Sequence, residues 1–396
     1  MSKEYVLRDI GEIYDGPHAT PKRQTEGKYF LNISSLDNGR LQLRKSDHIS
    51  DIDYEKWTRR ITPQANDLLF SYETRLGEAA LMPGGIKAAL GRRMALLRPD
   101  TSKVDPDFLL YKWLSPQWQA LISERTLHGA TVNRIPIRDI PDWPITLPPL
   151  SQQNAIASIL RSLDNKIAGN NNIISSSQEI MVALAKKCNT SVLIKTLASK
   201  STQTLNPQTL DHQQVLHYSI PAFDKGHVDI ENAKNIKSSK FQLNKPCVLV
   251  SKLNPRIPRV WSVPTINQSM YALASTEFIV LEPINCTSGQ LFAAVSQPSL
   301  FLQLQAQASG TSNSHQRIRP DDLSNALVPD TRELPNNDVE LLNSLNLLIE
   351  CRTQENQTLA RTRDELLPLL MSGKITVRDA EEASAEVGVD KHEVEE

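Results

Sequence analysis

The sequence contains few cysteines and no long apolar run. Its four cysteines are scattered, and no two are close enough for a CxxC metal knuckle or redox pair. That usage is typical of reduced thiols in a cytosolic protein. No apolar run reaches the length of about eighteen residues that a membrane span needs, and residues 1–10 lack an apolar signal core. We therefore expect neither secretion nor membrane insertion, but a cytoplasmic protein.

Motifs of catalysis are also lacking. There is no GxGxxG dinucleotide fingerprint, no GxxxxGK[ST] phosphate loop, no HExxH zinc motif and no [DNS]PP[YFW] tetrad of amino-methyltransferases. Gly373 and Lys374 lack the upstream glycine of a phosphate loop, so Gly373 is better explained as a helix C-cap. The eight histidines are dispersed without ligand spacing. We expect no catalytic residue, no metal site and no cofactor of the chain's own, which favours a binding protein.

The charge of the chain is unevenly distributed. Its 396 residues exceed what one compact core usually holds, and their net charge is only −1. Residues 379–396, however, hold eight acidic residues against one lysine, a net of −7 that leaves +6 for residues 1–378. This aromatic-free tail is expected to be solvated and disordered. The folded body is mildly basic, which is compatible with a nucleic-acid partner.

Two amphipathic segments have the alternating spacing of four and three that is typical of a coiled-coil seam. The first seam comprises Ile156, Leu160, Leu163, Ile167, Asn170, Ile174, Ser177, Met181 and Leu184. The second comprises Leu341, Leu345, Leu348, Arg352, Glu355, Leu359, Thr362, Leu366 and Leu369, each 185 residues after its counterpart. We expect two helices, each ~50 Å long, that pair antiparallel and oppose their polar central positions. The alternative is that each helix only caps its own domain.

The segments that precede the two helices repeat more loosely. "LNISSLDNGRL" (31–41) resembles "YSIPAFDKGHV" (218–228), each read as a strand followed by a hairpin turn. "DLLFS" (67–71) resembles "CVLVS" (247–251), and "MALLRP" (94–99) resembles "FIVLEP" (278–283). A helical stretch follows in each half, at 107–125 and 288–308. The expected fold is α+β, with two similar globular domains alternating with the two long helices.

The repeat divides the chain into five parts. They are domain 1 (1–149), a central helix (150–187), domain 2 (188–335), a C-terminal helix (336–378) and the acidic tail (379–396). A coil of ~50 Å spans roughly one and a half turns of B-DNA, so two domains with unlike loops could read two unlike half-sites.

Several loops combine cations for phosphates with flat donors for base edges. In domain 1 the candidate DNA contacts are His18, Thr20, Lys22, Arg23, Arg75, Arg92, Arg93, Asn133 and Arg134. In domain 2 they are Lys252, Asn254, Arg256, Arg259, Ser314, His315, Gln316 and Arg317. For any single residue an exposed, solvating loop charge is an equally good explanation, but the occurrence of such sets at equivalent places in both halves favours function.

The chain resembles the DNA specificity (S) subunit of type I restriction-modification systems over about residues 5–378. The resemblance rests on "DGPHATPK", "SKLNPRIPRVW", "STEFIVL", "GTSNSHQRIRPDDL", "LPPLSQQNAIASIL" and "RDELLPLLMSGKI". It implies two target-recognition domains that read the halves of an asymmetric double-stranded DNA site, with the coil setting the gap. It also implies two modification (methyltransferase) subunits and restriction (translocase and nuclease) subunits as partners. S-adenosylmethionine, ATP and Mg would act in those partners, and the acidic tail lies outside the family core.

Two alternatives remain open. The chain could be a non-catalytic coiled-coil scaffold whose basic loops meet acidic proteins, or the DNA-reading subunit of another phage-defence complex. An enzyme with an unrecognised site would have to show turnover by the isolated chain.

Overall fold

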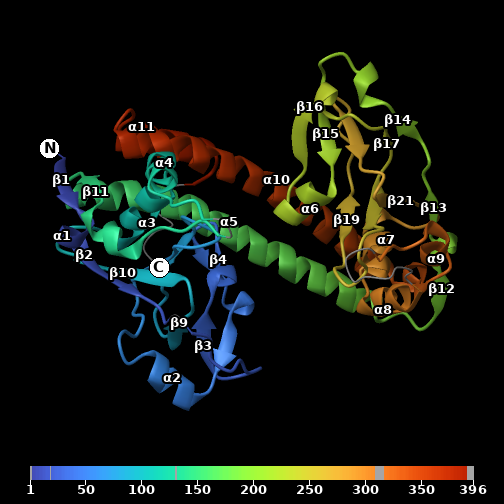
Figure 1. The fold of residues 1–396 in the computed structure, drawn as a ribbon. Coiled ribbons are helices and arrows are strands. Elements are labelled where there is room, and N and C mark those ends of the chain that lie inside the picture. Colours follow the sequence, from blue (N-terminus) through green and yellow to red (C-terminus); the bar gives the residue numbers. More distant parts are fainter. Residues whose placement is uncertain (1, 18, 130–131, 308–315, 390–396) are drawn as a thin grey trace. The chain divides into compact units, whose positions relative to one another are not determined.

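The chain divides into two compact units. The computed structural model describes residues 2–17, 19–129, 132–307 and 316–389. One unit comprises Met1–Lys166 and Leu359–Glu396, and the other Ile167–Thr358. Each unit therefore combines one domain of strands and short helices with part of each long helix (Figure 1). The expected α+β fold with two long helices is confirmed.

The first unit is built on an antiparallel sheet of order β2-β10-β7-β8. Its strands are β2 (Gly11–Asp15), β10 (Met94–Pro99), β7 (Leu68–Ser71) and β8 (Ala79–Leu81). A second sheet has the order β6-β3-β9, formed by β6 (Asp47–Ile49), β3 (Lys28–Leu31) and β9 (Ala88–Leu90), with β3 and β9 parallel. Two further pairs are β1 (Lys3–Val6) with β11 (Pro144–Leu147), and β4 (Leu36–Asp37) with β5 (Arg40–Leu41).

The expected helix at 107–125 is two helices. They are α3 (Pro106–Leu114) and α4 (Pro116–Glu124), and Ser115 ends the first and caps the second. The break follows from Pro116, which cannot donate a backbone hydrogen bond and disfavours a helical conformation at the preceding residue. Trp113 packs on Phe70 of β7, and Trp118 packs on Trp113, which joins these helices to the sheet. The remaining helices of this domain are α1 (Leu7–Ile10) and α2 (Asp51–Trp57).

The second unit repeats this plan. Its central sheet has the order β13-β21-β18-β19, from β13 (Ala198–Lys200), β21 (Phe278–Pro283), β18 (Cys247–Ser251) and β19 (Val260–Val263). A five-stranded sheet contains β14 (Thr204–Leu205), β17 (Lys240–Leu243), β20 (Tyr271–Ala274), β15 (Gln214–Tyr218) and β16 (Asp229–Asn232). β12 (Ser191–Leu193) pairs with β22 (Leu327–Pro329). Helices α7 (Ser288–Val295) and α8 (Pro298–Gln307), again separated at a proline, precede α9 (Pro320–Ser324).

Only one of the two expected hairpin turns forms. Asp37 pairs with Arg40 across Asn38 and Gly39, which both have positive φ as a two-residue hairpin requires. In the second domain, residues 224–226 instead end α6 (Ile220–Lys225), and Gly226 is its left-handed C-cap. The hairpin prediction is wrong there, because Ser219 caps a helix with Pro221 in its first turn.

The two long helices are α5 (Leu150–Ala185) and α10 (Asn336–Ser372). In the second unit Asn170 binds Glu355 and Asn356, whereas Lys187 pairs with Asp338, so the partners run in opposite directions. The expected antiparallel pairing is confirmed. Gly373 has positive φ and ends α10, as expected of a C-cap.

The expected seam fails at the start of the second helix. Leu341 is 42% exposed, while the next residue, Leu342, is fully buried against Gly289 of α7. The last turns show the same offset, because Leu370 is more deeply buried than Leu369. At its start α10 packs on domain 2 as well as on α5, because Leu342 belongs to the same core cluster as Leu291 and Phe292 of α7. The centre of the helix keeps the expected register, with Leu359 fully buried.

The polar centre of the helix pair is hydrogen bonded. Asn170 is 3% exposed, and its Nδ2 donates to Glu355 Oε2 at 3.0 Å and to Asn356 Oδ1 at 2.9 Å. Arg352 pairs with the same Glu355 oxygen at 2.5 Å. Polar seam residues usually fix register at a cost in stability.

Replacing Asn170, Arg352 and Glu355 together by leucine is expected to raise the thermal midpoint of the second unit by about 2–4 °C, the shift that ~1 kcal/mol gives in a unit of that size. The physical reason is that apolar packing replaces groups that are costly to desolvate. Calorimetry of the full chain measures the effect, and a clear fall in the midpoint would show that the polar cluster is a net source of stability.

A charged cluster attaches domain 1 to the helices in the first unit. Asp164 of α5 accepts hydrogen bonds from Arg363 Nη1 of α10 and from the Tyr111 hydroxyl of α3, both at 2.7 Å. Arg40 of the hairpin donates to the Asp164 carbonyl. Burial and the neighbouring Asp164 carboxylate raise the pKa of the Tyr111 phenol well above its ordinary value, so the phenol stays a donor.

The acidic tail is partly folded, which corrects the expectation of disorder for residues 379–389. α11 (Val377–Glu386) begins with a capping box between Thr376 and Asp379. Ala380, Ser384 and Val389 are buried, so one face of this helix packs on the first unit. The tail was misjudged because its acidic residues occupy the opposite face, while its few small apolar residues recur at helical spacing. Within the described parts of the chain, no helix is long and apolar enough to cross a membrane.

Candidate nucleic-acid interface

Several candidate loops of domain 1 lie at the same end of the strands of the central sheet. β2 ends at Asp15 opposite Ala95, and β7 ends at Ser71 opposite Met94, the first residue of β10. The segments that follow β2, follow β7 and precede β10 therefore start side by side. Residues 133–135 join them through backbone hydrogen bonds.

Three backbone hydrogen bonds hold these loops of domain 1 together. Tyr72 N donates to Arg93 O at 3.2 Å, and Ile135 N donates to Tyr72 O at 2.8 Å. Thr74 N donates to Asn133 O at 3.4 Å. These bonds form an arrangement that we call the loop frame. It brings together Arg75, Arg92, Arg93, Asn133 and Arg134, although up to 59 positions separate them in the sequence.

Domain 2 builds the same frame from different residues. Lys252 N donates to Glu277 O at 2.8 Å, and Ile318 N donates to Lys252 O at 2.8 Å. Asn254 N donates to Gln316 O at 2.9 Å. The two frames match bond by bond, so Arg317 in domain 2 occupies the place of Arg134 in domain 1.

One position of this frame has an unfavourable backbone conformation in both domains. Thr74 has φ +69° and Asn254 has φ +42°, in the left-handed region that side-chain-bearing residues rarely adopt. A β-branched residue such as Thr74 is especially costly there, by about 1–3 kcal/mol. Strain retained at equivalent loop positions in both halves favours a functional role for these loops.

The basic side chains of domain 1 differ in whether they form ion pairs. Arg93 pairs with Glu73 at 2.8 Å and Arg75 pairs with Glu78 at 2.9 Å. Arg92 and Arg134 are exposed, and neither makes an ion pair with the described residues. The ion pairs of Arg93 and Arg75 are partly exposed and therefore weak, so phosphate oxygens can replace the carboxylates in them.

In domain 2, Arg317 is the most accessible cation held in the frame. Its side chain is 60% exposed, and Nη2 donates to Glu277 Oε1 at 3.2 Å. Lys252 is half-buried, its Nζ donates to Thr276 O at 2.6 Å, and burial lowers its pKa. Arg256 is exposed, and its side chain makes no ion pair with the described residues.

Arg259 lies in a different setting from the other candidates. Its side chain is only 12% exposed and binds both carboxylate oxygens of Asp224, at 2.7 and 2.9 Å. This bidentate pair connects the loop between β18 and β19 to α6. Arg259 therefore makes a structural contact within domain 2, and its guanidinium is not a free donor.

The loop after β2 begins at the same end of the sheet and then runs along β6. Gly16 N donates to Met94 O, and a Cβ on Gly16 would lie 2.4 Å from Gly91 O, so the close approach requires glycine. Thr20, Lys22 and Arg23 follow and are exposed, with Arg23 Nε 3.2 Å from Asp47 of β6. Three further candidates, His18, Ser314 and His315, lie outside the described residues.

Reasoning from sequence missed the acidic partners of the frame. Glu73 and Glu277 orient Arg93 and Arg317, respectively. No signal in the sequence could have shown this, because each pair joins residues at least 20 positions apart whose proximity depends on strand pairing. Among the described residues, no group of three or more His, Cys, Asp or Glu side chains could hold a metal ion.

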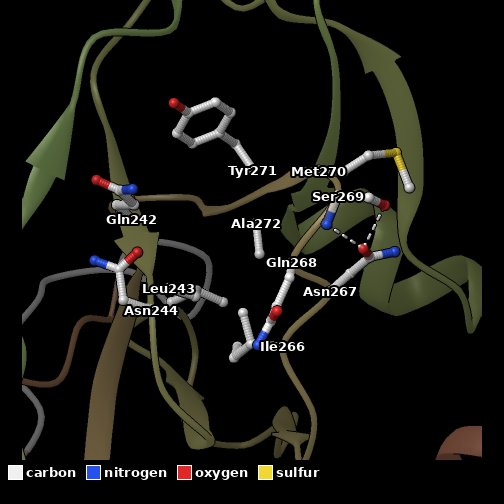
Figure 2. Close-up of a pocket in the computed structure, with 10 residues that line it drawn as sticks. All are labelled: Gln242, Leu243, Asn244, Ile266, Asn267, Gln268, Ser269, Met270, Tyr271 and Ala272. Atoms are coloured by element: carbon white, nitrogen blue, oxygen red, sulfur yellow. Dashed lines mark hydrogen bonds between the residues drawn. The ribbon is translucent and has the colours of Figure 1, made fainter.

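A separate polar hollow of about 400 Å³ lies at the other end of β20 in domain 2. Figure 2 shows that amide side chains surround it, from Gln242, Asn244, Asn267 and Gln268. The Asn267 Oδ1 accepts hydrogen bonds from the Ser269 amide and hydroxyl, which leaves Asn267 Nδ2 as its donor. Because Glu277 of the loop frame follows the opposite end of β20, this hollow is not part of the frame.

Comparison with known proteins agrees with the sequence motifs. Residues 2–176 match the family model of the type I restriction modification DNA specificity domain. The motifs and the repeated fold agree with this match, so residues 2–176 are similar to the type I restriction modification DNA specificity domain.

Two relatives illustrate the similarity. A putative type I restriction enzyme MjaX specificity subunit from Methanocaldococcus jannaschii is 27% identical over 190 residues, which cover 46% of this chain and 44% of that protein. The match thus spans less than half the length of the curated relative. The crystal structure of the type I restriction-modification system S subunit from M. genitalium aligns with a TM-score of 0.56 at 14% identity, covering 93% of this chain and 96% of that one. This likeness confirms the fold.

Proposed function

We propose that the chain is the DNA-reading subunit of a type I restriction-modification complex, with each domain recognising one half of a split, asymmetric site. The observation that carries the proposal is the loop frame, which is built twice with the same hydrogen bonds. Each copy presents an arginine, Arg134 or Arg317, at the same place. Arginine commonly binds guanine through two parallel hydrogen bonds.

The two frames would read unlike sequences, because the residues around the shared arginine differ. Thr74 and Asn133 in domain 1 correspond to Asn254 and Gln316 in domain 2. Asn and Gln side chains suit adenine edges, whereas threonine suits either a hydrogen bond or a thymine methyl contact. Unlike frames on one chain are what an asymmetric site requires.

Chemistry would belong to partner subunits. The proposal includes two methyltransferase subunits that use S-adenosylmethionine, and restriction subunits that use ATP and Mg, with the long helices as the assembly surface. Asn165 and Arg361 are exposed on α5 and α10 and suit such contacts.

Binding of the full chain to DNA at increasing salt tests the proposal. A bipartite sequence preference with an affinity that falls steeply with salt is expected, because phosphate contacts release counterions. Sequencing of methylated adenines in the host genome should then give a two-part motif with a fixed gap. Binding that lacks any sequence preference, or binding to acidic proteins alone, would favour the scaffold alternative; a two-part preference without methylated sites would favour another phage-defence complex.

A further inference from the structure

One position of the loop frame carries opposite charges in the two domains. It is the residue directly before a strand of the central sheet, which is Arg93 before β10 in domain 1 and Glu277 before β21 in domain 2. The two residues are equivalent because the carbonyl oxygen of each accepts the first hydrogen bond of its frame. The frame is therefore repeated in its backbone but not in its charges.

This difference changes which arginine has a carboxylate beside it. In domain 1, Glu73 lies opposite Arg134 in the frame but pairs with the arginine before β10, and Arg134 makes no ion pair with the described residues. In domain 2, the residue opposite Arg317 is Leu253, and Arg317 pairs with Glu277. The exposed arginine is thus unpaired in domain 1 and paired in domain 2.

Glu277 is held in a fixed position. Its backbone N donates to Ser275 Oγ at 3.3 Å, its carbonyl accepts from Lys252 N at 2.8 Å, and the next residue, Phe278, is fully buried. Its Oε1 accepts from Arg317 Nη2 at 3.2 Å, whereas its Oε2 is closed to solvent and has no hydrogen-bond partner among the described residues. Because Oε2 cannot reach a ligand, Glu277 acts as a fixed negative charge beside Arg317.

A fixed negative charge affects the possible DNA partners of Arg317 unequally. DNA offers an arginine the anionic oxygens of its phosphates and the neutral O6 and N7 acceptors of guanine. The Glu277 carboxylate repels a phosphate that approaches Arg317, but it exerts no charge–charge repulsion on a neutral base edge. A group that repels the wrong partner is a general source of specificity. In domain 1 the equivalent Arg93 is a cation and attracts phosphates.

We propose that Glu277 is a specificity-determining residue of domain 2, which disfavours phosphate contacts by Arg317 and so keeps its guanidinium available for a base edge. Glu277 acts through Arg317 and does not itself contact the base. Domain 1 has a cation at this position, so it discriminates less strictly at the base pair that Arg134 reads. This inference rests on the proposed function of DNA reading and adds how one half-site is read more strictly than the other.

Glu277→Gln tests the role of the charge, because glutamine keeps the shape of the side chain and an oxygen acceptor for Arg317. The full chain is titrated, by fluorescence anisotropy, with three duplexes. The first is the duplex that the unmodified chain selects from a randomised pool, and the second differs from it at the base pair that Arg317→Ala no longer distinguishes. The third has an unrelated sequence.

The variant is expected to bind the unrelated duplex about threefold more tightly, since one repulsive charge near the phosphates is removed. Discrimination between the first two duplexes is expected to fall about tenfold, because Arg317 is drawn to phosphates. The slope of log affinity against log salt should become steeper by about 0.9, the value for one additional phosphate contact. Loss of a purely structural residue would not raise affinity or steepen this slope.

Two further variants make the test specific. Glu277→Asp keeps the negative charge and is expected to retain the original salt slope, with discrimination within about threefold of the original. Asp211→Asn removes an acidic charge of domain 2 outside the frame, on a side chain that is 90% exposed. It should leave affinity, discrimination and salt slope unchanged.

Unchanged discrimination and salt slope in Glu277→Gln would overturn the inference. An equal loss of affinity on all three duplexes would overturn it as well, because Glu277 would then be only structural. Either result would leave the proposed function intact, since the unmodified chain would still select a two-part site. If the unmodified chain selected no sequence from the pool, the proposed function would be wrong and this inference with it.

Discussion

Replacing Arg317 by alanine is expected to weaken recognition of one half of a split DNA site by about 1–3 kcal/mol, with little effect on the other half. Arg317 is held beside Asn254 by the loop frame of domain 2, and within the described ranges its exposed guanidinium pairs with the Glu277 carboxylate. A side chain so presented can exchange that weak ion pair for a base edge.

The matched variant is Arg134→Ala, because Arg134 occupies the same place in the frame of domain 1. It should affect the opposite half-site. Binding of both variants to oligonucleotides with either half randomised measures the effect, with Arg378→Ala, an exposed arginine of α11, as a control for the loss of positive charge. If either frame variant lost affinity equally on all sequences, its arginine would be a phosphate contact and the proposed base contact would be wrong.

Replacing Arg363 by glutamine is expected to destabilise the first unit by about 2–3 kcal/mol. The pair with Asp164 is largely buried, with side chains 24% and 19% exposed, and removal of one partner leaves a carboxylate without its charge. Breaking a fully buried pair costs about 3–5 kcal/mol, and the remaining exposure reduces that cost. Thermal unfolding followed by tryptophan fluorescence is the measurement, since four of the five tryptophans lie in residues 1–166.

The second unit supplies the compensating substitutions. Its equivalent residues are Phe292, Ile349 and Gln178, which carry no charge. The triple variant Tyr111→Phe, Asp164→Ile and Arg363→Gln introduces these uncharged residues into the first unit. The triple variant is expected to unfold within about 1 kcal/mol of the original chain, because apolar residues can replace a buried ionic cluster without loss. Gln178→Leu serves as the control at the exposed counterpart of Arg363. A triple variant less stable than Arg363→Gln alone would show that the cluster is a net stabiliser.

Periodicity predicted the elements that local sequence dictates. The helices α5 and α10, the strands β7, β10, β18 and β21, and the turn at Asn38 and Gly39 all formed where their residues indicated. Predictions failed where packing overrode a local pattern. Residues 224–226 became a helix cap, the prolines divided two expected helices, and the acidic tail folded as α11 on its small apolar face.

The sequence by itself determined that the chain is one unit used twice, because equal offsets of apolar residues and strand motifs are a property of order along the chain. Only the tertiary structure decided which residues meet within each unit. Strand pairing brings Arg134 beside Thr74, and Arg317 beside Asn254, over separations that no local pattern encodes. Side-chain packing likewise fills one junction with the Asp164 cluster and leaves a cavity of about 220 Å³ at the other, since a space is defined by its neighbours rather than by any single residue.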